Sequence, residues 1–94
     1  MTQKNEAYIQ FFKALANEER IEIVKLLKKN TEMCAQDVES HFFLEQSTTS
    51  HHLNTLRRAG IAKTRKEGRH IYYSLDLDQF KAQWDIFGAA IFSS

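Results

Sequence analysis

Apolar residues recur at intervals of three and four along the first half of the chain, which is the spacing of one face of an α-helix. The first such stripe, in segment 6–16, consists of Tyr8, Phe11, Phe12 and Leu15. A second helix is expected over residues 18–30, because Asn17 can cap it, acidic residues begin it and lysines end it. Its predicted inward stripe is Ile21, Val24 and Leu27. A third, shorter helix is expected from about residue 34 to residue 43, with Val38 and Phe42 inward.

The stretch QSTTSHHLNTLRRAG, residues 46–60, combines a helical core stripe with many hydrogen-bonding side chains. The inward stripe is Thr49, Leu53 and Leu56, at i, i+4 and i+7. Ser47 is the expected N-cap, and Gly60 is expected just beyond the C-terminus. The other side carries hydroxyl, amide and imidazole groups on Thr48, His51, His52, Asn54 and Thr55. We therefore predict a helix over about 47–59 with one face in the core and one polar face.

Beyond Gly60 the pattern changes to β-branched and aromatic residues around the turn Glu67-Gly68, which predicts a hairpin with strands at about 61–66 and 69–75. Asp76 or Asp78 can cap a last helix over about 77–92. Its apolar residues alternate steps of three and four, as in a seam that packs on another helix. They are Leu77, Phe80, Trp84, Phe87 and Ile91.

Composition narrows the class of protein. The 94 residues contain no proline and only three glycines, which favours long helices with short connections. We expect one domain over residues 1–94, mainly α with a small β-hairpin. A single cysteine excludes an intrachain disulfide, and no signal peptide or apolar run of about 20 residues is present, so the expected location is the cytoplasm and no membrane contact is expected.

Charge is distributed unevenly although the net value is only +1. Residues 46–72 carry six lysines and arginines against Glu67 alone, whereas the rest carries seven basic and eleven acidic residues. A basic face on an acidic body is typical of proteins that bind phosphate groups, although a solvated basic surface is the plainer alternative.

The order of elements favours nucleic acid as the partner. A short helix, a turn and a second helix with small polar residues at its start form a helix-turn-helix, and a basic hairpin behind it forms a wing. Short polar side chains on such a helix can read base edges in the major groove, and its N-terminus can hold a phosphate. An enzyme is disfavoured, because no nucleophile stands with a histidine and an orienting group in a recognisable arrangement.

Three blocks, ALANEERIEIVKLL, QSTTSHHLNTLRRAGI and EGRHIYYSL, resemble the winged helix-turn-helix repressors of the ArsR/SmtB family over about residues 8–76. The resemblance implies a homodimer, held by the first and last helices, that binds inverted-repeat operators in double-stranded DNA. It implies DNA contacts from the recognition helix at Gln46, Ser47, Thr48, Ser50, His51 and His52. It implies wing contacts at Arg65, Lys66, Arg69 and His70. With the apolar seam, it predicts a dimer interface of Tyr8, Phe11, Phe12, Leu77, Phe80, Trp84, Phe87 and Ile91.

Many members of that family release DNA when they bind a metal, through a Cys-x-Cys on the third helix or through Asp and His on the last helix. Here Cys34 matches the first cysteine, but Gln36 replaces the second, and all four histidines precede the last helix. One thiolate is too few ligands for a soft metal, so no metal site and no cofactor are expected.

Two alternatives stay open at this point. Cys34 can be a small apolar residue or the sensor of a redox- or metal-responsive repressor. The domain can also be a protein-interaction module that keeps the winged-helix shape without binding DNA, although such a module has no need for the basic helix and wing. Adjacent positions send His51 and His52 to different sides of the helix, which favours DNA contact for one and packing for the other.

Overall fold

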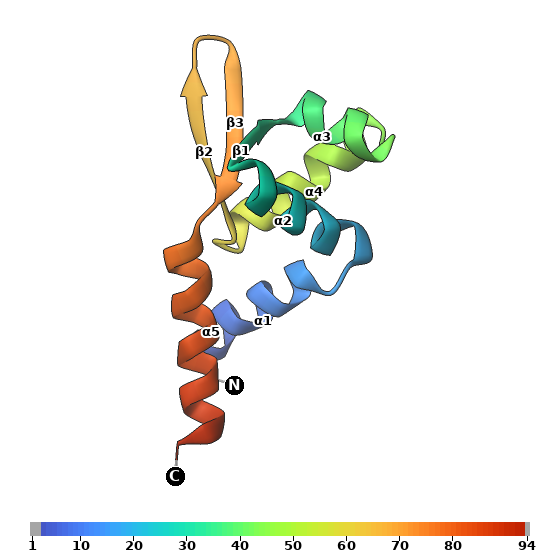
Figure 1. The fold of residues 1–94 in the computed structure, drawn as a ribbon. Helices are drawn as coiled ribbons and strands as arrows, with labels where there is room; N and C mark the ends of the chain where they lie inside the picture. Colours follow the sequence, from blue (N-terminus) through green and yellow to red (C-terminus); the bar gives the residue numbers. More distant parts are fainter. Residues whose placement is uncertain (1–2, 94) are drawn as a thin grey trace.

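The computed structural model describes residues 3–93 and contains five helices and three short strands in that range (Figure 1). In chain order they are α1 (Gln3–Leu15), α2 (Glu18–Asn30), β1 (Glu32–Cys34), α3 (Ala35–Phe42), α4 (Gln46–Arg58), β2 (Ala62–Glu67), β3 (His70–Leu75) and α5 (Leu77–Phe92). The mainly helical winged helix-turn-helix expected from the sequence is confirmed, with α3 and α4 as the helix pair and β2–β3 as the wing.

Helix α2 begins as its sequence predicts but buries a different face. The Oδ1 atom of Asn17 accepts a hydrogen bond from the backbone N–H of Arg20 at 3.0 Å, which caps the helix. Its buried residues are Ile23, Leu26 and Leu27. The predicted stripe was therefore wrong at Ile21, which is 40% exposed, because two overlapping apolar stripes fit this helix and the packing of its neighbours selects one.

Strand β1 is the element that sequence analysis missed. It pairs antiparallel with β3, Met33 opposite Tyr73, so the sheet has three strands in the order β1-β3-β2 rather than two. Three residues are too few for alternation to reveal a strand, and only the distant partner β3 makes one of them. The strand joins the start of the helix-turn-helix to the base of the wing.

The core lies where α1, α2, α3 and α4 meet the end of the wing. Its largest fully buried side chains are Phe11, Ile23, Leu27, Leu53, Leu56, Ile61, Val38 and Thr49. The inward stripe predicted for the fourth helix is confirmed, since Thr49, Leu53 and Leu56 are all 0% exposed. One face of α4 is thereby held in the core.

Helix α5 runs away from the core with α1 beside it, which gives the molecule extents of 47 × 23 × 23 Å (Figure 1). Aromatic rings of the two helices pack edge to face. The ring centroids of Phe11 and Phe80 are 5.1 Å apart. The centroid of Phe87 is 4.8 Å from that of Phe12 and 5.7 Å from that of Tyr8. Several residues assigned to the dimer interface therefore pack within one chain.

Phe11 is the clear correction among them. It is 1% exposed and belongs to the core, so its predicted place in the dimer interface was wrong. The apolar stripe of α1 packs against α5 of the same chain. Sequence spacing does not distinguish such a contact from a helix–helix contact with a second chain. Leu77, Trp84 and Ile91 are 51%, 56% and 59% exposed and remain available to a partner. None of the helices within residues 3–93 is long and apolar enough to cross a membrane.

Candidate nucleic-acid interface

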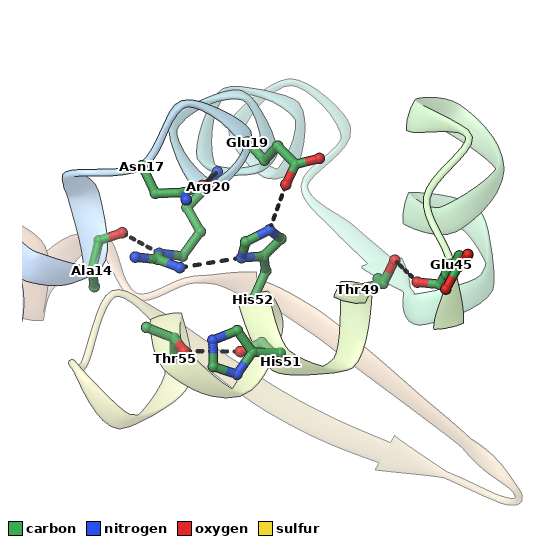
Figure 2. A network of polar contacts seen from close by, with 9 residues as sticks. All are labelled: Ala14, Asn17, Glu19, Arg20, Glu45, Thr49, His51, His52 and Thr55. Carbon is green, nitrogen blue, oxygen red and sulfur yellow. Dashed lines mark hydrogen bonds and ion pairs between the residues drawn. The ribbon is translucent and has the colours of Figure 1, made fainter. Parts of the chain in front are cut away.

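Helix α4 begins one residue earlier than expected, and Ser47 is not its N-cap. Glu45 occupies the cap position with an extended backbone and no side-chain hydrogen bond to the helix. The hydroxyl of Thr49 donates to the Glu45 carbonyl at 3.0 Å, which stabilises this turn from inside the helix (Figure 2). Ser47 lies exposed in the first turn and does not occupy the cap position.

At its C-terminus, α4 is followed by Gly60 just beyond the cap, as predicted. This residue has a φ of 76°, and its N–H donates to the Arg57 carbonyl while the N–H of Ile61 donates to that of Leu56, both at 3.0 Å. These two bonds form a Schellman motif. Glycine is favoured at this position because the motif needs a positive φ, which glycine adopts without strain. The motif turns the chain from the recognition helix directly into the wing.

The solvent face of α4 is polar and carries no acidic residue in its first turn. Most of the residues predicted to contact DNA are exposed there: Gln46, Ser47, Ser50 and His51. Thr48 is half-buried at the edge of the same face. The first two turns thus present an amide, two hydroxyls and an imidazole.

His52 is the exception among the predicted DNA contacts, and of the two adjacent histidines it is the one that packs inward. The residue is 5% exposed, and its ring lies between α4 and the start of α2 (Figure 2). The Nε2 atom is 2.9 Å from a carboxylate oxygen of Glu19, and Nδ1 is 3.2 Å from Nη1 of Arg20. Because a guanidinium only donates, Nδ1 must accept, and the ring proton on Nε2 is donated to Glu19. His52 therefore joins α4 to the start of α2 and is not exposed on the solvent face of α4.

Arg20 extends this network to the end of α1, and sequence analysis missed its role. Its Nε donates to the Ala14 carbonyl at 2.6 Å, and Nη2 donates to the Lys13 carbonyl at 3.1 Å. One guanidinium thus satisfies the last carbonyls of α1 while it donates to the histidine on α4. The only sequence signal was an arginine among the acidic residues of the first turn of α2.

The wing projects from the core with residues 63–70 all exposed (Figure 1). Strands β2 and β3 pair from Ala62↔Leu75 to Glu67↔His70, and Gly68 makes the turn with a φ of 61°. Strand β2 and the start of β3 are one residue later than predicted, whereas β3 ends at Leu75 as predicted. The basic residues Lys63, Lys66 and Arg69 and the imidazole of His70 therefore stand on an extended ribbon.

Arg65 differs from its basic neighbours because its charge is already paired. Its guanidinium donates to Glu32 of β1 at 2.6 and 3.3 Å and to Glu67 at 2.7 Å, and it lies over the Tyr72 ring. The hydrogen bond from Arg65 lowers the pKa of the Glu32 carboxyl, and that carboxylate in turn raises the pKa of Arg65. Arg65 joins the wing to β1, a role that depends on the strand that sequence analysis missed.

Lys66 and Arg69 have no acidic partner within 4.0 Å among residues 3–93. They and Lys63 are the wing cations free to pair with phosphate groups. The exposed face of α4 and the wing lie on consecutive elements, and the Schellman turn at Gly60 sets the angle between them.

Cys34 ends β1 and precedes α3, where it is partly buried. Its thiol lies 3.2 Å from a carboxylate oxygen of Asp37. Within the part of the chain that the structure describes, no three His, Cys, Asp or Glu side chains come together as a metal site would require.

Comparison with known proteins gives a consistent result. The family model described as "Bacterial regulatory protein, arsR family" matches residues 17–64. The chain is 44% identical over 70 residues to the cadmium resistance transcriptional regulatory protein CadC homolog of Staphylococcus aureus, which covers 74% of this chain and 58% of that protein. It is 38% identical over 85 residues to the transcriptional activator HlyU of Vibrio cholerae, which covers 89% of this chain and 78% of that protein.

Solved structures agree with this match. HlyU from Vibrio cholerae superposes with a TM-score of 0.73 and 32% identity over 100% of both chains. The homodimeric winged helix-turn-helix DNA-binding domain Mb0332 from Mycobacterium bovis superposes with a TM-score of 0.75, and at 22% identity it supports the fold alone. The relatives differ in length, and the chain spans little more than half of the CadC homolog.

Proposed function

Because this chain belongs to the arsR family of bacterial regulatory proteins, we propose that it is a transcriptional regulator that binds double-stranded DNA as a homodimer. The family consists of regulators and not of enzymes. The place of action that follows is the cytoplasm, where the DNA is. The observation that carries the proposal is the exposed, acid-free polar face on the first turns of α4 beside a wing with unpaired cations.

The recognition helix α4 supplies sequence readout in this proposal. Gln46 can make a paired contact with adenine, and the hydroxyls of Ser47 and Ser50 can bond to either kind of base edge. His51 is exposed on the same side, one turn from Ser47. The unpaired N–H groups at the start of α4 favour a phosphate there. His52 contributes indirectly, because it holds α4 against α2 and the end of α1.

The wing supplies affinity without sequence preference. Lys66 and Arg69 stand on the exposed ribbon and can neutralise backbone phosphates, with Lys63 and His70 beside them. Arg65 acts within the sheet, since its bond to Glu32 joins the ribbon to β1 and its bond to Glu67 lies within β2.

A second copy of the chain covers the exposed seam of α5. Leu77, Trp84 and Ile91 are separated by seven residues, lie along one line of the helix and are each more than half exposed. The partly exposed Phe87 and Tyr8 border this line. A two-fold dimer places two recognition helices in successive major grooves, which predicts an operator that is an inverted repeat.

We also propose that the regulator works without a bound metal. Supporting this, the thiol of Cys34 is paired with one carboxylate, and Gln36 stands where a second thiolate is needed. The alternative at this position is that oxidation of Cys34 changes the affinity for DNA.

The experiment that tests DNA readout measures binding to an operator and to random DNA by fluorescence anisotropy. Replacing Gln46 and Ser50 together with alanine should weaken operator binding by about tenfold or more and leave binding to random DNA nearly unchanged. Lys81→Ala on α5, far from the face, is the matched control. Equal loss on both DNAs would contradict base readout by α4.

A further inference from the structure

A polar cavity lies where α1 and α5 meet the end of the recognition helix. It has a volume of about 400 Å³ and is lined by Glu6 and Gln10 of α1, by residues 58–60 and by Gln79 and Gln83 of α5. This volume is within the range of sites for small molecules. None of these residues belongs to the proposed readout of bases by α4 and the wing.

Gln83 gives the cavity an unmet hydrogen-bonding need. The residue is 9% exposed, and its Nε2 donates to the Ala59 carbonyl at 3.1 Å. Its Oε1 is buried and has no donor among the described residues. Turning the amide over would place Oε1 against the Ala59 carbonyl, so the assignment is fixed by that bond. A buried acceptor without a donor is costly, and a ligand N–H or O–H that reached it would recover that cost.

The charged groups of the cavity indicate what kind of ligand fits. Glu6 contributes one negative charge and Arg58 contributes one positive charge. A net anion or a net cation would leave one of them unmatched. A small zwitterion satisfies both, with its ammonium group donating to Gln83 Oε1 and Glu6 and its carboxylate on Arg58.

A second copy of the chain on the α5 seam does not occupy this cavity. Gln83 comes one residue before Trp84, and one residue turns an α-helix by about 100°. The cavity is therefore on a different side of α5 from the line of Leu77, Trp84 and Ile91. The ligand site and the proposed dimer contact can be filled at the same time.

The cavity is also placed to affect the recognition helix. An adjoining cavity of about 390 Å³ shares Glu6, Gln10, Arg58 and Ala59 and extends to Arg20 and Thr55. Arg20 is the residue that donates to His52 and so positions α4. A ligand at Gln83 and Arg58 contacts both the α1–α5 framework and the end of α4.

We propose that this cavity is an effector site for a small zwitterion of the free amino acid class, and that its occupation changes the affinity for DNA. The coupling rests on the proposed DNA-binding function, whereas the binding does not. Ligand binding is therefore measured first on the intact protein without DNA.

The probes are the common free L-amino acids at millimolar concentration, each compared with its N-acetyl derivative and its methyl ester, which remove one charge. Binding is followed by calorimetry and by the NMR signal of the Gln83 side-chain amide. We expect at least one amino acid to bind and to shift that signal, with both derivatives about tenfold weaker or more. If no amino acid binds, or if the blocked derivatives bind equally well, the zwitterion site is overturned.

Two variants keep the test independent of folding. Gln83→Leu removes the buried acceptor, and Glu6→Gln removes the carboxylate at an exposed position that the core does not need. Each should weaken binding about tenfold, whereas Lys81→Gln should leave it unchanged. Unaltered binding in Glu6→Gln, which keeps the fold, would overturn the proposed ligand geometry. In a final step, a bound amino acid that leaves DNA affinity unchanged would overturn the effector role alone.

Discussion

Replacing each of the adjacent residues His51 and His52 with alanine should give opposite results. His52 is 5% exposed and bonded to Glu19 and Arg20, whereas His51 is exposed on the solvent face of α4 (Figure 2). We expect His52→Ala to lower the free energy of unfolding and His51→Ala to lower DNA affinity. The pair serves as its own control, because the same side chain is removed at neighbouring positions of one helix.

The size of the His52 effect follows from its contacts. The bond to Arg20 involves a charged donor, a kind worth about 1.5–3 kcal/mol. The bond to Glu19 adds less, about 0–1 kcal/mol, because the Glu19 side chain is 49% exposed and returns to water. With the space left by the imidazole, the total is about 2–4 kcal/mol. A chain of 94 residues has a total stability of about 5–14 kcal/mol, so the loss is large.

Urea unfolding followed by circular dichroism, at one fixed protomer concentration, measures this change. The midpoint for His52→Ala should fall by about 1–2 M with an unchanged m-value. His51→Ala should change the free energy of unfolding by no more than about 0.5 kcal/mol and should weaken operator binding by about 1–3 kcal/mol. A His52→Ala protein as stable as the wild type would refute the positioning role of the buried network.

Four further results are expected. Lys66→Ala should reduce the slope of log affinity against log salt by about 0.9 per protomer contact, on operator and random DNA alike, in a salt titration. Arg65→Ala should instead remove an acid-sensitive contribution to stability. In the wild type the pKa of Glu32 is lowered by Arg65, so the pair stabilises the fold at pH values above the ordinary pKa of a glutamate, and this stabilisation is lost as the pH falls through the lowered pKa. The free energies of unfolding of variant and wild type, measured against pH, should therefore differ only above that range. Trp84→Glu should convert the dimer to monomers in sedimentation, whereas a stable wild-type monomer at micromolar concentration would refute the α5 interface. Zinc against chelator should change operator affinity less than tenfold, and any response to oxidants should disappear in Cys34→Ser.

Features set by local spacing were predictable from the sequence. The five helices, the Asn17 cap, the Gly60 turn and the hairpin all depend on residues within one or two turns of each other. The inward stripe of α4 was also predictable, because only one set of its positions is apolar at helical spacing. These elements sufficed to indicate a winged helix-turn-helix.

Features that depend on distant partners were not predictable in the same way. Strand β1 exists only because β3 pairs with it, and Arg65 is neutralised only because β1 brings Glu32 beside it. His52 is drawn inward by Arg20, which lies 32 positions away in sequence. Phe11 fits a helix–helix stripe whether the second helix belongs to the same chain or to a partner. Spacing alone therefore indicated the polar face of α4 but not which of its two histidines the core would retain.

One titration tests whether α4 and the wing together bind a specific DNA sequence. The intact protein is titrated onto the DNA upstream of its own gene and onto random DNA of equal length, at several salt concentrations. We expect binding to the upstream DNA to be at least about 10³-fold tighter than binding to random DNA, with the logarithm of both affinities falling linearly with log salt. Equal affinity for the two DNAs, or binding to neither, would contradict it.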